Sequence, residues 1–144
     1  MKNELITTAL GLLSILVVFV STKAYKKFTS PKSILGIFKG YCKNNTGTES
    51  ILMLSVIEQN GAKIEGMVTI SGALAGAGNF KGTVIKNKIE FVSKDEHGII
   101  ITWIGQIEKN KMKGNYFTSL SLDIKEKYNI SDQEGIWELH QPNS

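Results

Sequence analysis

The side chains that could carry out catalysis or bind a metal are few in this chain and lie apart in the sequence. His97 and His140 are its two histidines, and neither belongs to a Cys-x-x-Cys or a His-Glu-x-x-His pattern. The run Asp95-Glu96-His97 has the composition of an acid and base cluster, but three polar residues before a glycine are typical of a solvated turn. We therefore predict no catalytic residue, no metal site and no cofactor, and a protein that is not an enzyme.

Cys42 is the one possible thiol nucleophile. It alternates with Phe38 and Gly40, so in a strand all three face the same side. A thiol buried on such a face behaves as a small, inert hydrophobic group. A single cysteine allows no internal disulfide and fits a reducing compartment. No serine stands in a Gly-x-Ser-x-Gly elbow, so the chain offers no alternative nucleophile of that kind.

The glycine-rich stretch from Gly72 to Gly78 resembles a phosphate-binding loop only in composition. It lacks the Gly-Lys-Ser/Thr ending, and it joins strand to strand, whereas a phosphate loop opens a helix. We predict a flexible hairpin loop at a barrel mouth.

Aromatic residues at alternating positions could form an apolar binding cavity. They occupy the same strand face as a set of regularly placed glycines. The glycines could leave a cavity that the aromatic rings line, and such a cavity would bind a small apolar or amphipathic ligand. The alternative is that these side chains simply fill the interior of a small barrel, as side chains normally do. The hypothetical ligand-binding residues are Phe38, Phe80, Phe91, Trp103 and Tyr116.

Apolar residues recur with a period of two throughout residues 36–144, which predicts strands. The clearest example is 99–117, where Ile99, Ile101 and Trp103 fall on one face and the chain turns at Lys109-Asn110. Asn60-Gly61 is the strongest hairpin signal, since both central residues of that turn would need positive φ. The other expected strands cover residues 37–43, 51–58, 63–71, 80–85, 89–93 and 136–140, with one helical turn at 123–128. The strand at 51–58 is almost wholly apolar, which predicts burial on one face and cover on the other.

A large apolar residue stands two positions before a glycine in five of these strands. The glycines are Gly40, Gly66, Gly82, Gly105 and Gly114, all on the inward face, and Gly135 before Trp137 is a partial sixth copy. Inward glycines let a sheet bend sharply, and closure into a barrel removes exposed edges. We predict an all-β fold in which an eight-stranded antiparallel meander closes into an up-and-down β-barrel. A sandwich is the alternative, but the turns are mostly too short for its crossovers.

The string Thr102-Trp103-Ile104-Gly105-Gln106 and the hairpin at 60–66 carry a resemblance to a known family. Over residues 36–121 they resemble the avidin and streptavidin group within the calycin-type, lipocalin-like small up-and-down barrels. The resemblance implies that Trp103 lines the barrel beside a ligand. Biotin binding is not implied, because Gly40 stands where that family has a polar ligand contact and no terminal aspartate matches.

Residues 5–20 contain no charge, and uncharged residues extend this run to 22. Eighteen helical residues rise about 27 Å, close to the ~30 Å hydrocarbon core of a bilayer. A cleaved signal peptide would need a better small-x-small site than Thr22-Lys23-Ala24, and a buried core helix would need a polar face. We predict one N-terminal transmembrane helix: residues 1–23 as anchor, 24–35 as basic linker and 36–144 as the β-barrel domain, with the lipid bilayer contacted through residues 5–22.

The positive charge of the chain lies beside that apolar run. The net charge is +4, whereas residues 36–144 contain twelve lysines, twelve carboxylates and no arginine. By the positive-inside rule, the lysines after the run place the C-terminal domain on the cytoplasmic side of the membrane. The alternative is an exported or periplasmic domain with an uncleaved anchor. A neutral domain without arginine excludes nucleic acid as the expected partner.

Two non-enzymatic functions fit these features. The first is a membrane-anchored accessory or adaptor domain that holds a protein partner through an outer face or the charged 122–135 connection. It is favoured by outward apolar positions such as Tyr41, Met67, Ile104 and Phe117. The second is a carrier or sensor of a small apolar ligand inside the barrel. The membrane tether favours the first function.

Overall fold

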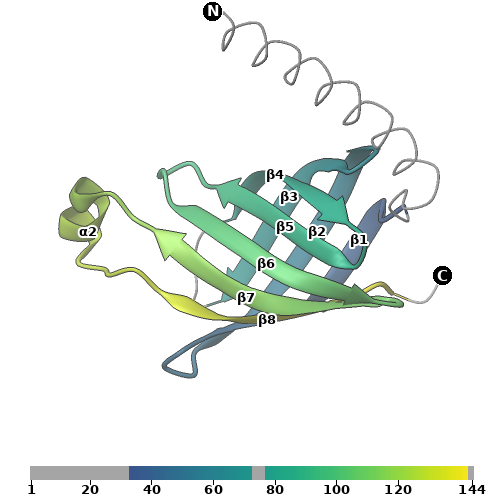
Figure 1. Ribbon diagram of the computed structural model, residues 1–144. Coiled ribbons are helices and arrows are strands. Elements are labelled where there is room, and N and C mark those ends of the chain that lie inside the picture. The colour runs from purple at the N-terminus through teal and green to yellow at the C-terminus, as the bar shows by residue number, and fades with distance from the viewer. Residues whose placement is uncertain (1–32, 73–76, 143–144) are drawn as a thin grey trace, which may run out of the picture. The chain divides into compact units, whose positions relative to one another are not determined.

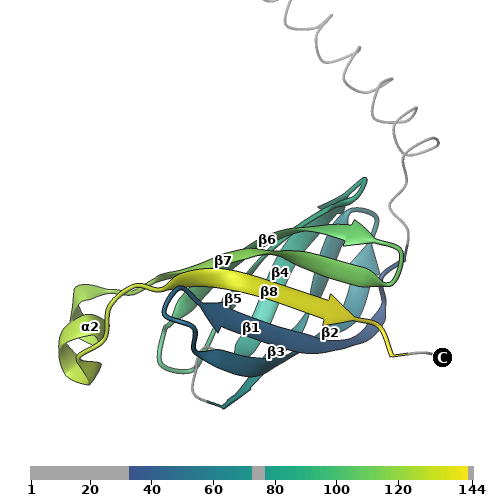
Figure 2. The same cartoon turned by 90° about the horizontal axis from the view of Figure 1, so that it is seen from below.

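The computed structural model describes residues 33–72 and 77–142, which form an all-β closed barrel with one short helix (Figures 1 and 2). The predicted anchor at 1–23 and most of the linker lie outside the described residues. In the part that is described, no helix is long and apolar enough to cross a membrane. The elements are β1 (Gly36–Asn44), β2 (Glu49–Asn60), β3 (Lys63–Gly72), β4 (Gly78–Ile85), β5 (Lys88–Lys94), β6 (Ile100–Glu108), β7 (Lys111–Ser119), α2 (Leu122–Tyr128) and β8 (Glu134–His140).

Each strand pairs in antiparallel fashion with the next one along the chain, and β8 pairs with β1 to close the barrel. The closing ladder runs through pairs such as Gly40 with Leu139 and Cys42 with Trp137. This meander confirms the predicted up-and-down barrel and excludes the sandwich alternative. The predicted strands also agree with the observed ones to within a few residues at each end.

Alternation of buried and exposed residues follows the predicted period of two. In β5, for example, Ile89, Phe91 and Ser93 are buried, while the residues between them are exposed. The prediction of cover on both faces of the apolar second strand is wrong. Its inward residues are buried, but Ile51 and Ile57 are 66% and 69% exposed. A closed single-layer barrel leaves its outer face to solvent unless another element packs there.

Three two-residue turns share one backbone feature, a positive φ at the first central residue. These residues are Gly61 (φ 62°), Lys86 (φ 56°) and Lys109 (φ 54°). The Asn60-Gly61 turn was predicted one residue too early. Asn60 pairs with Lys63, so the central residues are Gly61 and Ala62, and only the glycine has positive φ. At positive φ, a lysine is destabilised by roughly 1 kcal/mol because its Cβ lies too close to the backbone.

We expect Lys86→Gly to raise the free energy of unfolding by about 1 kcal/mol, because glycine adopts positive φ without that steric cost. Urea unfolding followed by tryptophan fluorescence measures the change. Lys86→Ala is the control, since it removes the charge but keeps a Cβ. An equal gain in both variants would show that charge, and not backbone conformation, limits stability at this turn.

The two ends of the barrel differ, and we name them by the strand termini. The proximal end is where β1 begins and β8 ends, and it carries the turns at 61–62, 86–87 and 109–110. Ile34 is buried there, and its backbone N–H donates to Gln59 Oε1 at 2.8 Å. The distal end carries the longer connections and α2, which Figure 1 shows beside the turn before β6. Ser121 caps this helix by accepting from the Ile124 N–H at 3.3 Å.

Inward glycines stand where neighbouring strands come close together. A Cβ built on Gly114 would collide with the carbonyl oxygen of Ile104, and one built on Gly66 with that of Ser55. Gly105 and Gly114 lie directly opposite each other in β6 and β7. These positions have no room for a side chain because the neighbouring backbone occupies it, which is how the sheet bends enough to close.

Candidate functional site

All five aromatic residues predicted to line a ligand cavity lie inside the barrel. None is more than 4% exposed. Phe91 stacks on Trp103 with ring centroids 5.6 Å apart and an interplanar angle of 9°. Phe80 lies 5.1 Å from Phe91, and Tyr116 lies 5.2 Å from Trp103. Four of the five therefore form one continuous cluster, whereas Phe38 lies in the core near the proximal end, where it borders a small cavity of about 110 Å³.

Trp137 joins this cluster and was not among the predicted lining residues. Its ring contacts Phe91 and Trp103 edge to face, at 5.8 and 6.2 Å. Its place two residues after Gly135 repeats the glycine spacing and could have identified it. Both indole N–H groups have partners within the protein: Trp103 Nε1 donates to Ser93 Oγ at 2.9 Å and Trp137 Nε1 to the Asn115 carbonyl at 3.0 Å.

The aromatic rings occupy the space beside the inward glycines. A Cβ on Gly105 would lie 2.6 Å from Trp137 Cζ2, one on Gly66 2.8 Å from Phe80 Cε1, and one on Gly135 2.7 Å from Tyr116 Cε1. Glycines and rings are thus complementary in volume, as in other close-packed interiors. At these three positions the missing side chains make room for the protein's own rings.

The Tyr116 hydroxyl is the one buried side-chain nitrogen or oxygen without a hydrogen-bond partner among the described residues. Burial raises the pKa of Tyr116 to about 12, and the nearby Cys42 thiol adds to the shift. Burial also raises the pKa of Cys42 to about 11, with Glu49 as the second cause. Both groups are therefore neutral at pH 7, and the Cys42 thiol is protonated and inert.

These two pKa shifts predict a loss of stability in alkali. The folded pKa values exceed the ordinary values of 9.0 for Cys42 and 10.0 for Tyr116. Their contribution is fully present below about pH 9 and is lost as the pH rises toward 12, because the unfolded chain releases these protons first. Tyr116→Phe should lose less stability between pH 9 and 11 than the wild type does in urea unfolding. Tyr128→Phe, which alters an exposed ring, is the control and should follow the wild type.

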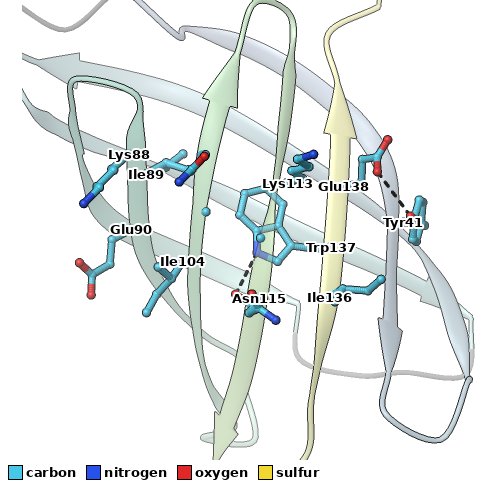
Figure 3. A pocket seen from close by; sticks show the side chains of 13 residues that line it. Tyr41, Lys88, Ile89, Glu90, Ile104, Lys113, Asn115, Ile136, Trp137 and Glu138 are labelled. Atoms are coloured by element: carbon cyan, nitrogen blue, oxygen red, sulfur yellow. Dashed lines mark hydrogen bonds between the residues drawn. The ribbon is translucent and has the colours of Figure 1, made fainter.

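A groove of about 570 Å³ lies on the outer face of the barrel, over β5 to β8 and β1 (Figure 3). The paired glycines Gly105 and Gly114 line it together with Trp137. Ile89, which pairs with Gly105, lines it as well, and cross-strand pairing places the remaining residues in two rows. The first row is polar and contains Lys88, Gln106, Lys113, Glu138 and Tyr41; the second contains Glu90, Ile104, Asn115 and Ile136.

The two rows give the groove an amphipathic character. In the second row Ile104 and Ile136 flank Asn115 and are 45% and 47% exposed. In the first row Lys88 and Lys113 are exposed and form no ion pair within the described part of the chain. The groove thus presents the cations of Lys88 and Lys113 beside a row that contains two exposed isoleucines and the exposed carboxylate of Glu90.

Glu138 is compensated within the protein. Its Oε1 lies 3.0 Å from Lys111 Nζ and 3.0 Å from His140 Nε2, and the Tyr41 hydroxyl donates to its Oε2 at 3.5 Å. The hydrogen bond from Lys111 holds the pKa of Glu138 below its ordinary value. These contacts reduce the negative charge that Glu138 contributes to the first row.

A second groove of about 560 Å³ adjoins the first and shares Asn115 and Ile136 with it. It extends toward the distal end over Tyr116, Phe117 and Gly135. Met67, Ile104 and Phe117, predicted to point outward, are 43–47% exposed, whereas Tyr41 is half-buried by its contact with Glu138. Of these four, Tyr41, Ile104 and Phe117 border the two grooves; Met67, on β3, is not among their lining residues.

The Asp95-Glu96-His97 segment forms a turn, as predicted. Asp95 Oδ1 accepts from the backbone N–H groups of His97 and Ile99, at 3.0 and 2.7 Å. His97 lies 3.4 Å from the exposed Glu96 carboxylate, far along the chain from His140 on β8. No group of three or more metal-ligating side chains occurs within residues 33–72 and 77–142.

Comparison with known proteins supports the fold. No protein-family model matches the chain, and no curated protein matches it either. Among solved structures, "EF1p2_mFAP2b bound to DFHBI" superimposes with a TM-score of 0.61 at 14% identity, over 76% of this chain and 94% of that one. At this identity the likeness concerns the backbone alone. Together with the eight-stranded closed meander, it fits the predicted resemblance to the calycin-type small barrels in architecture.

Proposed function

We propose that this protein is a non-enzymatic accessory domain, tethered to a membrane by residues 5–22, that binds a protein partner along the outer face of β5 to β8 and β1. The observation that supports this best is the contrast between the two faces of the sheet. Inside, aromatic rings pack against the glycines and both indole N–H groups are satisfied. Outside, two adjoining grooves expose apolar side chains beside unpaired lysines.

The character of the groove indicates the kind of segment that fits it. Two exposed isoleucines, Ile104 and Ile136, offer apolar surface, and Lys88 and Lys113 stand in the neighbouring row. A partner segment that places apolar side chains on the isoleucines and carboxylates toward the lysines is complementary to both rows. The eight described strands close on one another and leave no free edge among them, so such a segment binds through side chains and not by strand addition.

Site-specific photo-crosslinking in membranes of the source cells tests this function. A photoreactive residue at Asn115, between the two isoleucines, should give one adduct of defined mass. The same residue at Met67, an exposed position on β3, is the matched control. Ile136→Glu should abolish the Asn115 adduct while the barrel stays folded. Identical adducts from both positions, or an adduct that survives Ile136→Glu, would contradict the proposal.

The orientation follows from the lysines near the apolar run, which favour a cytoplasmic barrel. Reporter enzymes fused after Ser144 test it. A reporter that is active only outside the cytoplasm would assign the barrel to the exported side.

A second candidate function, a carrier of a small amphipathic ligand, is favoured by the Tyr116 hydroxyl. A buried hydroxyl without a partner costs about 1–3 kcal/mol, which a ligand acceptor could recover. The similar barrel bound to DFHBI shows that this type of backbone is compatible with a small ligand. Titration of fatty acids and aromatic anions against tryptophan fluorescence tests this candidate. It requires a saturable change in the wild type that weakens in Tyr116→Phe.

A further inference from the structure

The turns at the proximal end of the barrel carry a different charge from the connections at the distal end. The proximal segments 58–63, 85–88 and 108–111 contain five lysines and two carboxylates, and one of the five, Lys111, is paired with Glu138 of β8. The distal segments 43–50, 94–99 and 120–134 contain four lysines and seven carboxylates. A domain that is neutral overall is thus basic at one end and acidic at the other. The proximal lysines are Lys63, Lys86, Lys88, Lys109 and Lys111.

Two of these lysines stand at the tips of rigid turns. Lys86 and Lys109 both have left-handed backbone conformations and are both followed by asparagine. The carbonyl of Asn87 accepts from Ile107 N–H at 2.7 Å, and that of Asn110 accepts from Gln141 N–H at 3.0 Å. Neither lysine side chain has a carboxylate partner in the part of the chain that is described. Both line the cavity of about 110 Å³ that opens at this end.

Exposed apolar side chains surround the same end. Ile57 stands at the irregularity between Val56 and Glu58 in β2, and Ile85 is the last residue of β4. The exposed fractions are 48% for Leu35 and Ile37, 69% for Ile57 and 47% for Ile85. Apolar side chains interspersed with lysines are the composition of surfaces that rest in the interfacial region of a bilayer.

The described chain begins at this same end. Ser33 lines the proximal cavity together with Lys86 and Lys109. Nine residues lie between Lys23, the first charge after the predicted anchor, and Ser33, and an extended chain from Lys23 to Ser33 spans about 35 Å at most. The described chain therefore enters the barrel at its basic end.

We infer that the proximal end of the barrel binds the headgroups of an anionic lipid leaflet, so that the outer grooves stand beside the membrane and the acidic distal end points away from it. The inference rests on the proposed membrane tether. Lipid fits better than nucleic acid because the cations are lysines among exposed isoleucines, without arginine or exposed aromatic rings at this end. Each lysine near an anionic surface contributes roughly fivefold to binding.

The test uses the full-length chain mixed with phosphatidylcholine vesicles, either alone or with phosphatidylglycerol as an anionic lipid. About 30 mol% phosphatidylglycerol is enough to give the vesicles a negative surface potential. Asn60→Cys places a fluorophore at the proximal end, and Asn45→Cys places one at the distal end. The buried Cys42 stays unlabelled at pH 7. Headgroup spin labels should quench the Asn60 fluorophore in anionic vesicles and leave the Asn45 fluorophore unquenched.

Charge variants separate the lysine contribution. Lys86→Asn with Lys109→Asn removes two cations and keeps a residue type that tolerates left-handed φ, so contact should weaken about 25-fold. Lys43→Gln with Lys94→Gln removes two distal cations and should change nothing. Equal quenching at both labels, or quenching that is independent of anionic lipid, would overturn the inference.

Vesicle flotation distinguishes this inference from the tether itself. Flotation only with anionic vesicles, lost in the Lys86→Asn, Lys109→Asn variant, would support proximal lipid binding and disprove the anchor. Flotation with neutral vesicles, together with equal quenching of the Asn60 and Asn45 fluorophores, would support the anchor and disprove lipid binding by the proximal end. No flotation with either vesicle would disprove both.

Discussion

Gly114→Ala is expected to destabilise the barrel by at least about 3 kcal/mol, more than any single surface change. The new Cβ would fall on the carbonyl oxygen of Ile104 and on Gly105 Cα, both backbone atoms of β6. Backbone atoms cannot move aside as a flexible side chain can, so the β6–β7 ladder would have to separate at its glycine pair. Urea unfolding monitored by circular dichroism measures the loss.

Asn115→Ala is the matched control for Gly114→Ala. It lies one residue away in β7 but faces outward, where its side chain is exposed. Its unfolding midpoint should shift little, by less than about 0.5 kcal/mol. If Gly114→Ala were as stable as this control, the two strands could not be as close as the structure has them.

Trp103→Ala should cost about 3–5 kcal/mol, the range for deleting a large buried aromatic side chain. Trp103 is fully buried, stacked on Phe91 and in contact with Tyr116 and Trp137. Its removal also leaves Ser93 Oγ without its donor. The vacated space is lined by rings, and an apolar cavity of that kind can bind a small aromatic molecule.

Trp103→Phe separates packing from hydrogen bonding. It keeps a ring against Phe91 and removes only the donor to Ser93, so the expected loss is about 1–2 kcal/mol. Added indole should raise the thermal midpoint of Trp103→Ala and leave the wild type and Trp103→Phe unchanged. Stabilisation of the wild type by indole would indicate that its interior already has room for a ligand.

The sequence alone predicts most of this fold because strand alternation is a local property. Ile101 and Trp103 face inward as their spacing indicates, and the glycines two residues after large apolar residues lie where strands approach closely. The turn predicted at Asn60-Gly61 lies one residue later in the structure, at Gly61-Ala62. The composition of a turn does not define which residues pair across it. The prediction that both faces of β2 are covered is wrong at Ile51 and Ile57, which are exposed. The hydrophobicity of a strand does not show whether another element packs on its outer face.

The grooves could not be predicted because they depend on register among four or five strands. Ile104 and Ile136 are far apart in sequence, and only the pairing of β6, β7 and β8 sets both beside Asn115. The Tyr116 hydroxyl likewise looks like any inward tyrosine until its surroundings are known. The charge difference between the two ends of the barrel, in contrast, can be predicted from the sequence. In any antiparallel meander alternate connections fall at the same end, so their charges can be summed from the sequence.

Closure of β8 against β1 also has a consequence for how the chain folds during synthesis. The residues that pair, such as Gly40 and Leu139, come from the beginning and the end of the domain. Contacts so distant in sequence form slowly, and here they cannot form until β8 has left the ribosome. Until then β1 and β7 both present unpaired edges on which other chains can add strands. A nascent chain of this protein should therefore need protection from aggregation until its last strand is made.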